Sequence, residues 1–148
     1  MSKVIALYHI VFCTKNRRMT IPLEQREHLY RFIWKECTDE FHSKLLRIGG
    51  VQNHVHILVN LHPSVSLAVF VKEIKAHSSG WLAKDKRFPD FEGWAKGYFA
   101  GTVSALNKID VIEYIINQER HHMVQDFDNE LFRLHEEGGL EYDNRDMN

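Results

Sequence analysis

The chain has 148 residues, of which 44% are hydrophobic, and its formal net charge is -1 at pH 7. This length suits one globular domain, and no run of about 18 apolar residues exists that would predict a membrane-spanning helix. The N-terminal apolar segment is too short for a signal peptide, so we expect a cytoplasmic protein with no membrane partner.

Charge is divided unevenly along the chain. Residues 1–100 hold 15 Lys and Arg against 9 Asp and Glu, whereas residues 101–148 hold 4 against 11. A basic region can bind phosphate groups while the tail stays acidic. The small net charge therefore does not exclude a nucleic-acid partner.

Hydrophobic patterning predicts strands and helices in mixed order. The expected strands cover 8–14, 44–51, 54–60 and 98–104, and the expected helices cover 23–38, 66–79, 109–122 and, within the acidic tail, 130–136. Gln52-Asn53 is the expected turn between the second and third strands. The order β, α, β, β, α, β, α predicts an α+β fold, a ferredoxin-like or RRM-like antiparallel sheet with helices packed on it, in one domain.

Two histidines, His54 and His56, flank Val55 at the start of a β-branched run. Residues two apart in a strand point to the same face, so both imidazoles can face one metal ion while Val55 packs into the core. In a chain with ten histidines, two of them can also fall two residues apart by chance. The pattern alone leaves a metal site and a structural pair as alternatives.

The expected helix over 109–122 carries a tyrosine and a glutamine, Tyr114 and Gln118, four residues apart. Their side chains lie one above the other on the flank of the apolar stripe made by Ile109, Ile112, Ile115 and Ile116. A tyrosine beside a buried stripe is more often a core residue than a nucleophile. Periodicity alone therefore favours packing.

Several basic and aromatic side chains are candidates for nucleic-acid contact. The candidate phosphate contacts are Lys15, Arg17, Arg18, Lys72, Lys75, Lys84, Lys86 and Arg87, of which the first five are predicted to bind DNA. The aromatic group is Trp81, Phe88, Phe91, Trp94, Tyr98 and Phe99, for which core packing is favoured over base stacking. His9, inside the first strand, is expected to be a core residue.

In their order and spacing, these segments resemble the single-tyrosine HUH transposases of bacterial insertion sequences and their domesticated, repeat-associated relatives. The resemblance runs from about Tyr8 to Arg120. Its carriers are residues 8–15 with Arg17-Arg18, the triplet His54-Val55-His56 with Ile57-Leu58-Val59, and residues 72–75, 97–103 and 113–118.

The resemblance implies that Tyr114 is the nucleophile and that His54, His56 and Gln118 bind a divalent metal, Mg²⁺ or Mn²⁺. The implied activity is DNA transposition, in which single-stranded DNA is cleaved and rejoined at hairpin-bearing element ends through a 5′-phosphotyrosine. It also implies a homodimer in which the tyrosine helix of one subunit can serve the histidines of the other. The transposase domain would cover residues 1–125, with residues 126–148 as an acidic tail of the same domain.

One residue departs from the family pattern, and two other functions stay open. Relatives commonly carry an Asp where this chain has Asn53, so we expect weaker ion binding.

The main alternative function is that of a domesticated or non-catalytic protein of the same fold that binds nucleic-acid hairpins. A metal-dependent hydrolase of unrelated type ranks last, because no further ligands have the spacing of a closed site.

Overall fold

A computed structural model of the protein describes residues 2–118, 127–143 and 145. Its centre is a four-stranded antiparallel sheet in the order β2-β3-β1-β4. The strands are β1 (Leu7–Cys13), β2 (Lys44–Gly50), β3 (His54–Asn60) and β4 (Phe99–Val103). The predicted α+β, ferredoxin-like class with one domain is confirmed.

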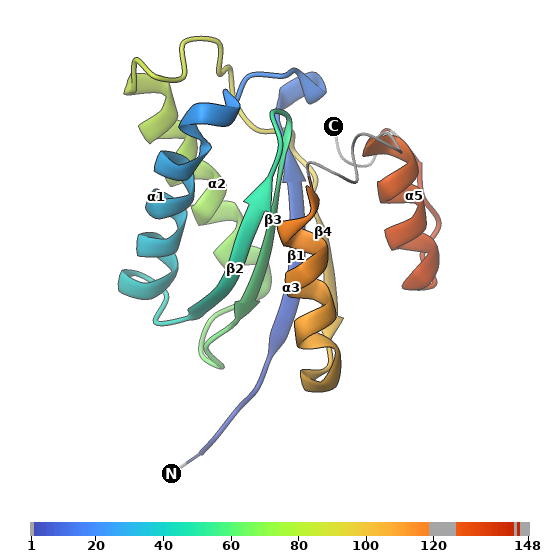
Figure 1. Ribbon diagram of the computed structural model, residues 1–148. Coiled ribbons are helices and arrows are strands. Elements are labelled where there is room, and N and C mark those ends of the chain that lie inside the picture. Colours follow the sequence, from blue (N-terminus) through green and yellow to red (C-terminus); the bar gives the residue numbers. More distant parts are fainter. Residues whose placement is uncertain (1, 119–126, 144, 146–148) are drawn as a thin grey trace.

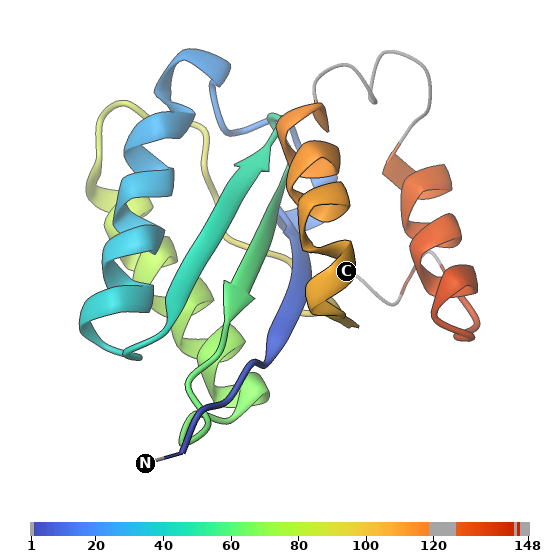
Figure 2. The ribbon, with the colours of Figure 1, turned by 60° about the horizontal axis from the view of Figure 1, so that its bottom comes forward.

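Helices cover both faces of this sheet (Figures 1 and 2). One face carries α1 (Arg26–Asp39) and α2 (Leu67–Lys84), and the other carries α3 (Lys108–Ile116) and α5 (Phe127–Glu137). Within the described residues, these elements are preceded or linked by short 3₁₀ turns at Lys15–Arg17, Leu23–Gln25 and Ala105–Asn107. Among the described helices, none combines the length and the apolar character needed to cross a membrane.

Each of the four predicted helices is present in the described residues with bounds that differ from those predicted, most clearly at the ends of α2 and α3. Helix α2 continues past Ser79 to Lys84, because the buried Leu82 extends the apolar face of Ile74. Helix α3 ends at Ile116, where Asn117 leaves the helical region with φ -90° and ψ 17°. The rest of the expected helix over 109–122, from residue 119, lies outside the described residues.

Strand β3 divides its side chains between the two faces. Val55, Ile57 and Val59 pack against α1 and α2 in the larger core cluster, which also receives Phe88 and most of the predicted aromatic group. His54 and His56 therefore point to the opposite face, the one covered by α3 and α5. Both histidines face away from the larger core, toward the tyrosine helix.

A glycine in β2 lets α3 lie close to the sheet. A Cβ atom built on Gly49 would stand 2.9 Å from the carbonyl oxygen of Ile115 and 2.8 Å from its Cγ2. Gly49 also pairs with His56 across the β2–β3 ladder. The missing side chain thus determines how near Tyr114 and Gln118 come to the two histidines.

We expect Gly49→Ala to lower the free energy of unfolding by about 1–3 kcal/mol, because the new methyl group overlaps the α3 backbone. The matched control is Gly80→Ala, near the C-terminal end of α2, where an added Cβ meets nothing within 4 Å. That change should stabilise the protein by roughly 0.5–1 kcal/mol through helix propensity. Urea denaturation of both variants measures the difference, and equal effects would contradict this role of Gly49.

Candidate active site

The two histidines of β3 are fully buried and close to each other. His54 and His56 are each 0% exposed, and their ring centroids lie 5.1 Å apart. Asn53 precedes them, and its Oδ1 atom lies 2.7 Å from Nδ1 of His54. The Asn53 amide nitrogen donates to the carbonyl oxygen of Arg17, which identifies Oδ1 as the atom facing His54. His54 therefore carries its proton on Nδ1, and its Nε2 lone pair points into the site.

The side chain of Gln118 meets this lone pair. Its Oε1 atom lies 3.3 Å from Nε2 of His54, while its amide nitrogen donates to the carbonyl oxygen of Tyr114 at 3.3 Å. The second bond fixes the orientation of the amide, so two acceptor atoms face each other. A shared proton or a cation between them satisfies both atoms.

Tyr114, on α3, completes the set of predicted residues. Its ring centroid lies 5.6 Å from that of His56, in an edge-on arrangement. Burial, and then the nearby charge of Glu130, raise the pKa of the Tyr114 phenol above its ordinary value. The phenol is therefore protonated at neutral pH. The structure thus brings His54, His56, Gln118 and Tyr114 together within one chain.

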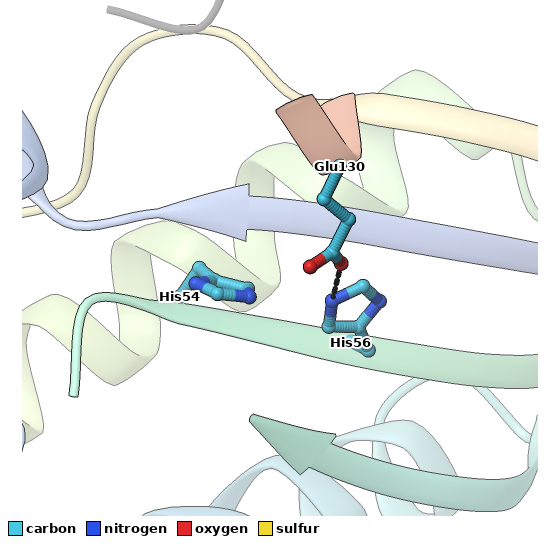
Figure 3. Close-up of side chains that lie close together, drawn as sticks. All are labelled: His54, His56 and Glu130. Atoms are coloured by element: carbon cyan, nitrogen blue, oxygen red, sulfur yellow. Dashed lines mark ion pairs between the residues drawn. The ribbon is translucent and has the colours of Figure 1, made fainter. Parts of the chain in front are cut away.

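Glu130, on α5, also belongs to this site, although the sequence analysis did not identify it. Its Oε1 atom lies 2.8 Å from Nε2 of His56, and the carboxylate lies between α5 and β3 (Figure 3). Glu130 is 0% exposed. The signal was present in the sequence, because Glu130 lies on the same helical face as Phe127, Leu131 and Leu134, where a charged residue needs a partner.

These side chains have the chemistry of a divalent metal site. One ligand atom each from His54, His56 and Glu130 lie within 4.8 Å of one another, and the amide oxygen of Gln118 adjoins them. Imidazole nitrogens and carboxylate or amide oxygens suit transition metals such as Mn²⁺, and oxygen ligands suit Mg²⁺. The donor set fits such an ion.

Comparison with known proteins identifies the family. The family described as "Transposase IS200 like" matches residues 3–118, which include both histidines, Tyr114 and Gln118. The chain belongs to the IS200-like transposases. Membership of this family supports the interpretation that the protein is a DNA-processing enzyme that acts in transposition.

The similar relatives of this IS200-like transposase include proteins from two bacteria. The transposases for insertion sequence element IS200 of Salmonella typhimurium (strain LT2) and of Salmonella typhi are each 30% identical to it over 116 residues. These alignments cover 75% of this chain and 75% of each relative.

Two solved structures share the fold of this transposase. A protein described as a transposase from Deinococcus radiodurans R1 is 24% identical, with a TM-score of 0.56 over 80% of this chain and 95% of its own. A REP-associated tyrosine transposase bound to a REP hairpin is 15% identical, with a TM-score of 0.61 over 96% of this chain and 87% of its own. At these identities the likeness shows the fold alone.

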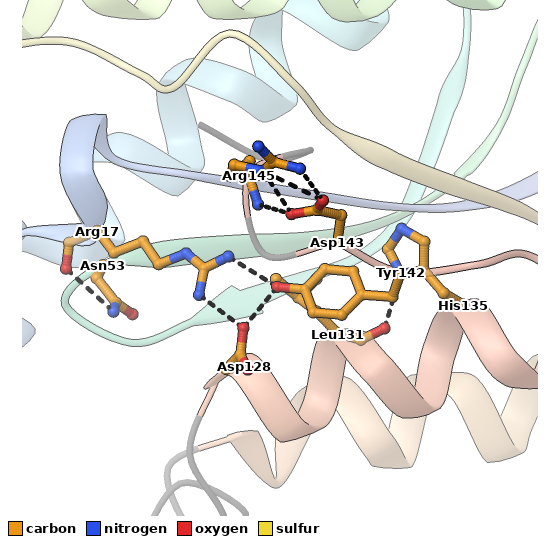
Figure 4. Close-up of polar contacts among 8 residues, drawn as sticks. All are labelled: Arg17, Asn53, Asp128, Leu131, His135, Tyr142, Asp143 and Arg145. Atoms are coloured by element: carbon orange, nitrogen blue, oxygen red, sulfur yellow. Dashed lines mark hydrogen bonds and ion pairs between the residues drawn. The ribbon is translucent and has the colours of Figure 1, made fainter.

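Helix α5 covers the site in this transposase. The Phe127 ring stacks on His54 with a centroid distance of 3.9 Å and an interplanar angle of 10°. The Arg17 guanidinium also contacts this helix and the segment after it, donating to Asp128 at 3.2 Å and to the Tyr142 hydroxyl at 2.8 Å (Figure 4). Tyr142 in turn donates to Asp128 at 2.7 Å. Helix α5 thus buries His54, His56 and Glu130, whereas the Tyr114 ring is half-buried and lines a cavity of about 390 Å³ together with His9.

The five residues predicted to bind DNA lie in two places. Lys15, Arg17 and Arg18 follow β1, whose last residue, Cys13, pairs with His54, so this turn borders the site. Arg17 is held by α5, and Arg18 pairs with Glu92 at 2.6 Å. Lys72 is exposed and Lys75 half-buried on α2, which packs on the opposite face of the sheet. The Lys75 ammonium donates to two backbone carbonyls, those of Lys96 and Gly97.

Proposed function

We propose that this transposase cleaves and rejoins single-stranded DNA at hairpin-bearing ends through a 5′-phosphotyrosine intermediate on Tyr114. The observation that carries the proposal is the convergence of a phenol, two imidazoles and a carboxamide on one buried point. We assign Tyr114 as the nucleophile and His54, His56 and Gln118 as ligands of Mg²⁺ or Mn²⁺. The catalytic domain would cover residues 1–125, and residues 126–148 would form a tail of the same domain.

The proposed chemistry is a transesterification. The Tyr114 oxygen forms a bond to phosphorus and gives its proton to solvent, the bond from phosphorus to the 3′-oxygen breaks, and that oxygen takes up a proton. A divalent cation in the site would polarise the phosphate and stabilise the leaving oxygen. Attack by a 3′-hydroxyl on the phosphotyrosine reverses the step, so rejoining needs no nucleotide hydrolysis.

The closed site requires that α5 move before DNA binds. His54, His56 and Glu130 are each 0% exposed, and Phe127 stacks on His54. A phosphodiester cannot reach the ligand atoms of His54 and His56 while these side chains stay in place. The Glu130 carboxylate also occupies a position beside His56 that a phosphate oxygen would take. We therefore propose that the two anionic groups exchange when DNA enters.

Nucleic-acid contacts and assembly complete the proposal. Lys15, Arg17 and Arg18 border the site, and release of α5 would free the Arg17 guanidinium for a phosphate. Lys72 and Lys75 would contact a DNA segment on the α2 side.

A homodimer is proposed from the family resemblance, although one chain already brings together all four candidate side chains. Such a protein would act in the cytoplasm.

The test is the polarity of a covalent adduct. The full chain is incubated with Mn²⁺ and single-stranded DNA from both flanks of its gene, labelled at either the 5′ or the 3′ end, and run on a denaturing gel. A 5′-phosphotyrosine links the protein to the 3′-labelled fragment and leaves the 5′-labelled fragment free. Chelation of the metal should remove both products. Adduct formation on the 5′-labelled fragment would contradict the assigned chemistry.

The second candidate function is a non-catalytic hairpin-binding protein, which the complete burial of His54 and His56 favours. It predicts hairpin binding without an adduct on either label. It also predicts that a double variant, His54→Ala with His56→Ala, binds hairpins as well as the wild type does. An adduct that the wild type forms and the double variant does not would exclude the non-catalytic function.

A further inference from the structure

We propose that His9 is a positioning residue for the candidate metal centre, which holds the His56 ring so that its Nε2 atom faces the ion. This inference rests on the proposed function. The sequence pattern predicts that His9 is a core residue. It is buried, with 6% exposure, but its side chain lies on the face of β1 that carries the site.

The contact between the two rings is direct. Nε2 of His9 lies 2.8 Å from Nδ1 of His56, and the rings lie nearly parallel at an interplanar angle of 23°. Edge-on contacts with Phe99 and Tyr114, at centroid distances of 6.3 and 6.0 Å, hold the His9 ring in turn. Both nitrogens of His56 are therefore in contact, through a hydrogen bond with His9 on one side and an ion-pair contact with Glu130 on the other.

The hydrogen-bond partners at Nδ1 of the two histidines differ chemically: His54 contacts an amide oxygen, and His56 contacts an imidazole. The Asn53 oxygen can only accept, so it keeps the His54 proton on Nδ1. An imidazole nitrogen accepts or donates according to its tautomer. When Nε2 of His56 binds a cation, Nδ1 must carry the proton and His9 must accept it. When Nε2 carries the proton and faces the Glu130 carboxylate instead, His9 donates to Nδ1.

His9 can therefore satisfy His56 both in the closed state and in the metal-bound state. Outer-shell partners that orient a ligating histidine typically contribute a factor of about 10–100 to metal affinity. A side chain without a polar atom at the Nε2 position of His9 would leave the buried Nδ1 of His56 without its partner. The ring would then lose its orientation toward the ion.

The test compares His9→Gln with His9→Asn, two amides that differ by one methylene. The Gln amide reaches the position of the His9 Nε2 atom, whereas the Asn amide ends one bond short. Mn²⁺ alone is titrated into the full-length protein, and free Mn²⁺ is followed by electron paramagnetic resonance. We expect His9→Asn to weaken Mn²⁺ binding by about 10–100-fold and His9→Gln to retain most of it.

A second readout separates positioning from loss of structure. In the adduct assay, His9→Asn should raise the Mn²⁺ concentration for half-maximal cleavage while keeping most of the rate at saturating Mn²⁺. Ile10→Val, a buried apolar change on the opposite face of β1, is the stability control and should leave the Mn²⁺ dependence unchanged. Equal Mn²⁺ affinities for His9→Asn and His9→Gln would overturn the inference.

The same Mn²⁺ titration distinguishes a failure of the inference about His9 from a failure of the proposed function. If the wild type binds no Mn²⁺, or if His54→Ala does not weaken binding, the metal centre itself is wrong. If His54→Ala abolishes binding and both His9 variants bind normally, the metal centre stands and the role of His9 is refuted.

Discussion

Replacing Tyr114 with Phe should abolish the covalent protein–DNA adduct and leave hairpin binding intact. The substitution removes one oxygen atom from a ring that keeps its contacts with His9 and His56. Without that oxygen no bond to phosphorus can form, so we expect the adduct to fall to background with either DNA label. Denaturing gels report the adduct, and gel-shift titration with a hairpin reports binding.

Tyr98→Phe is the matched control for this experiment. Tyr98 packs against the larger core cluster, on the other side of the sheet from the candidate site. Its variant should form the adduct at the wild-type rate. An adduct that persists in Tyr114→Phe would mean that another side chain is the nucleophile, and peptide mapping of the linked strand would identify it.

The hydrophobic pattern of the sequence predicts the features that follow the regular period of a strand or a helix. Alternation along residues 54–60 assigns His54 and His56 to one face and Val55 to the other, and the structure has that arrangement. The short Gln52-Asn53 turn predicts the β2–β3 pairing, which the ladder confirms. The family resemblance, now confirmed for residues 3–118, joins the histidines to a tyrosine far along the chain.

The contacts that close the site depend on elements distant in sequence, which local pattern cannot pair. Periodicity puts Glu130 and Phe127 on the buried face of a helix but does not say which part of the sheet they meet. His9 has the burial of an ordinary strand residue, and only the β1–β3 register brings it beside His56. The close approach of α3 likewise depends on Gly49, whose missing side chain has no signature in a hydrophobic pattern.

Loosening α5 should make the transposase faster. Phe127→Ala removes the ring that stacks on His54 and packs with Leu131, but it leaves the four proposed catalytic and metal-binding side chains unchanged. Truncation of a buried Phe costs about 3–5 kcal/mol, and each 1.4 kcal/mol changes an equilibrium about tenfold. If opening of α5 limits the reaction, we expect the initial rate of adduct formation to rise by about tenfold or more.

Phe132→Ala is the control, since Phe132 lies on the same helix with 52% of its surface exposed. Its rate should match that of the wild type. Hydrogen exchange of the α5 amides should accelerate in Phe127→Ala and not in Phe132→Ala, while exchange in β1 and β3 stays slow in both. If Phe127→Ala exchanges faster in α5 yet cleaves more slowly than the control, α5 supports the reaction rather than blocks it. Glu130 would then act as a working ligand, because the carboxylate beside His56 would be needed in the DNA-bound state as well.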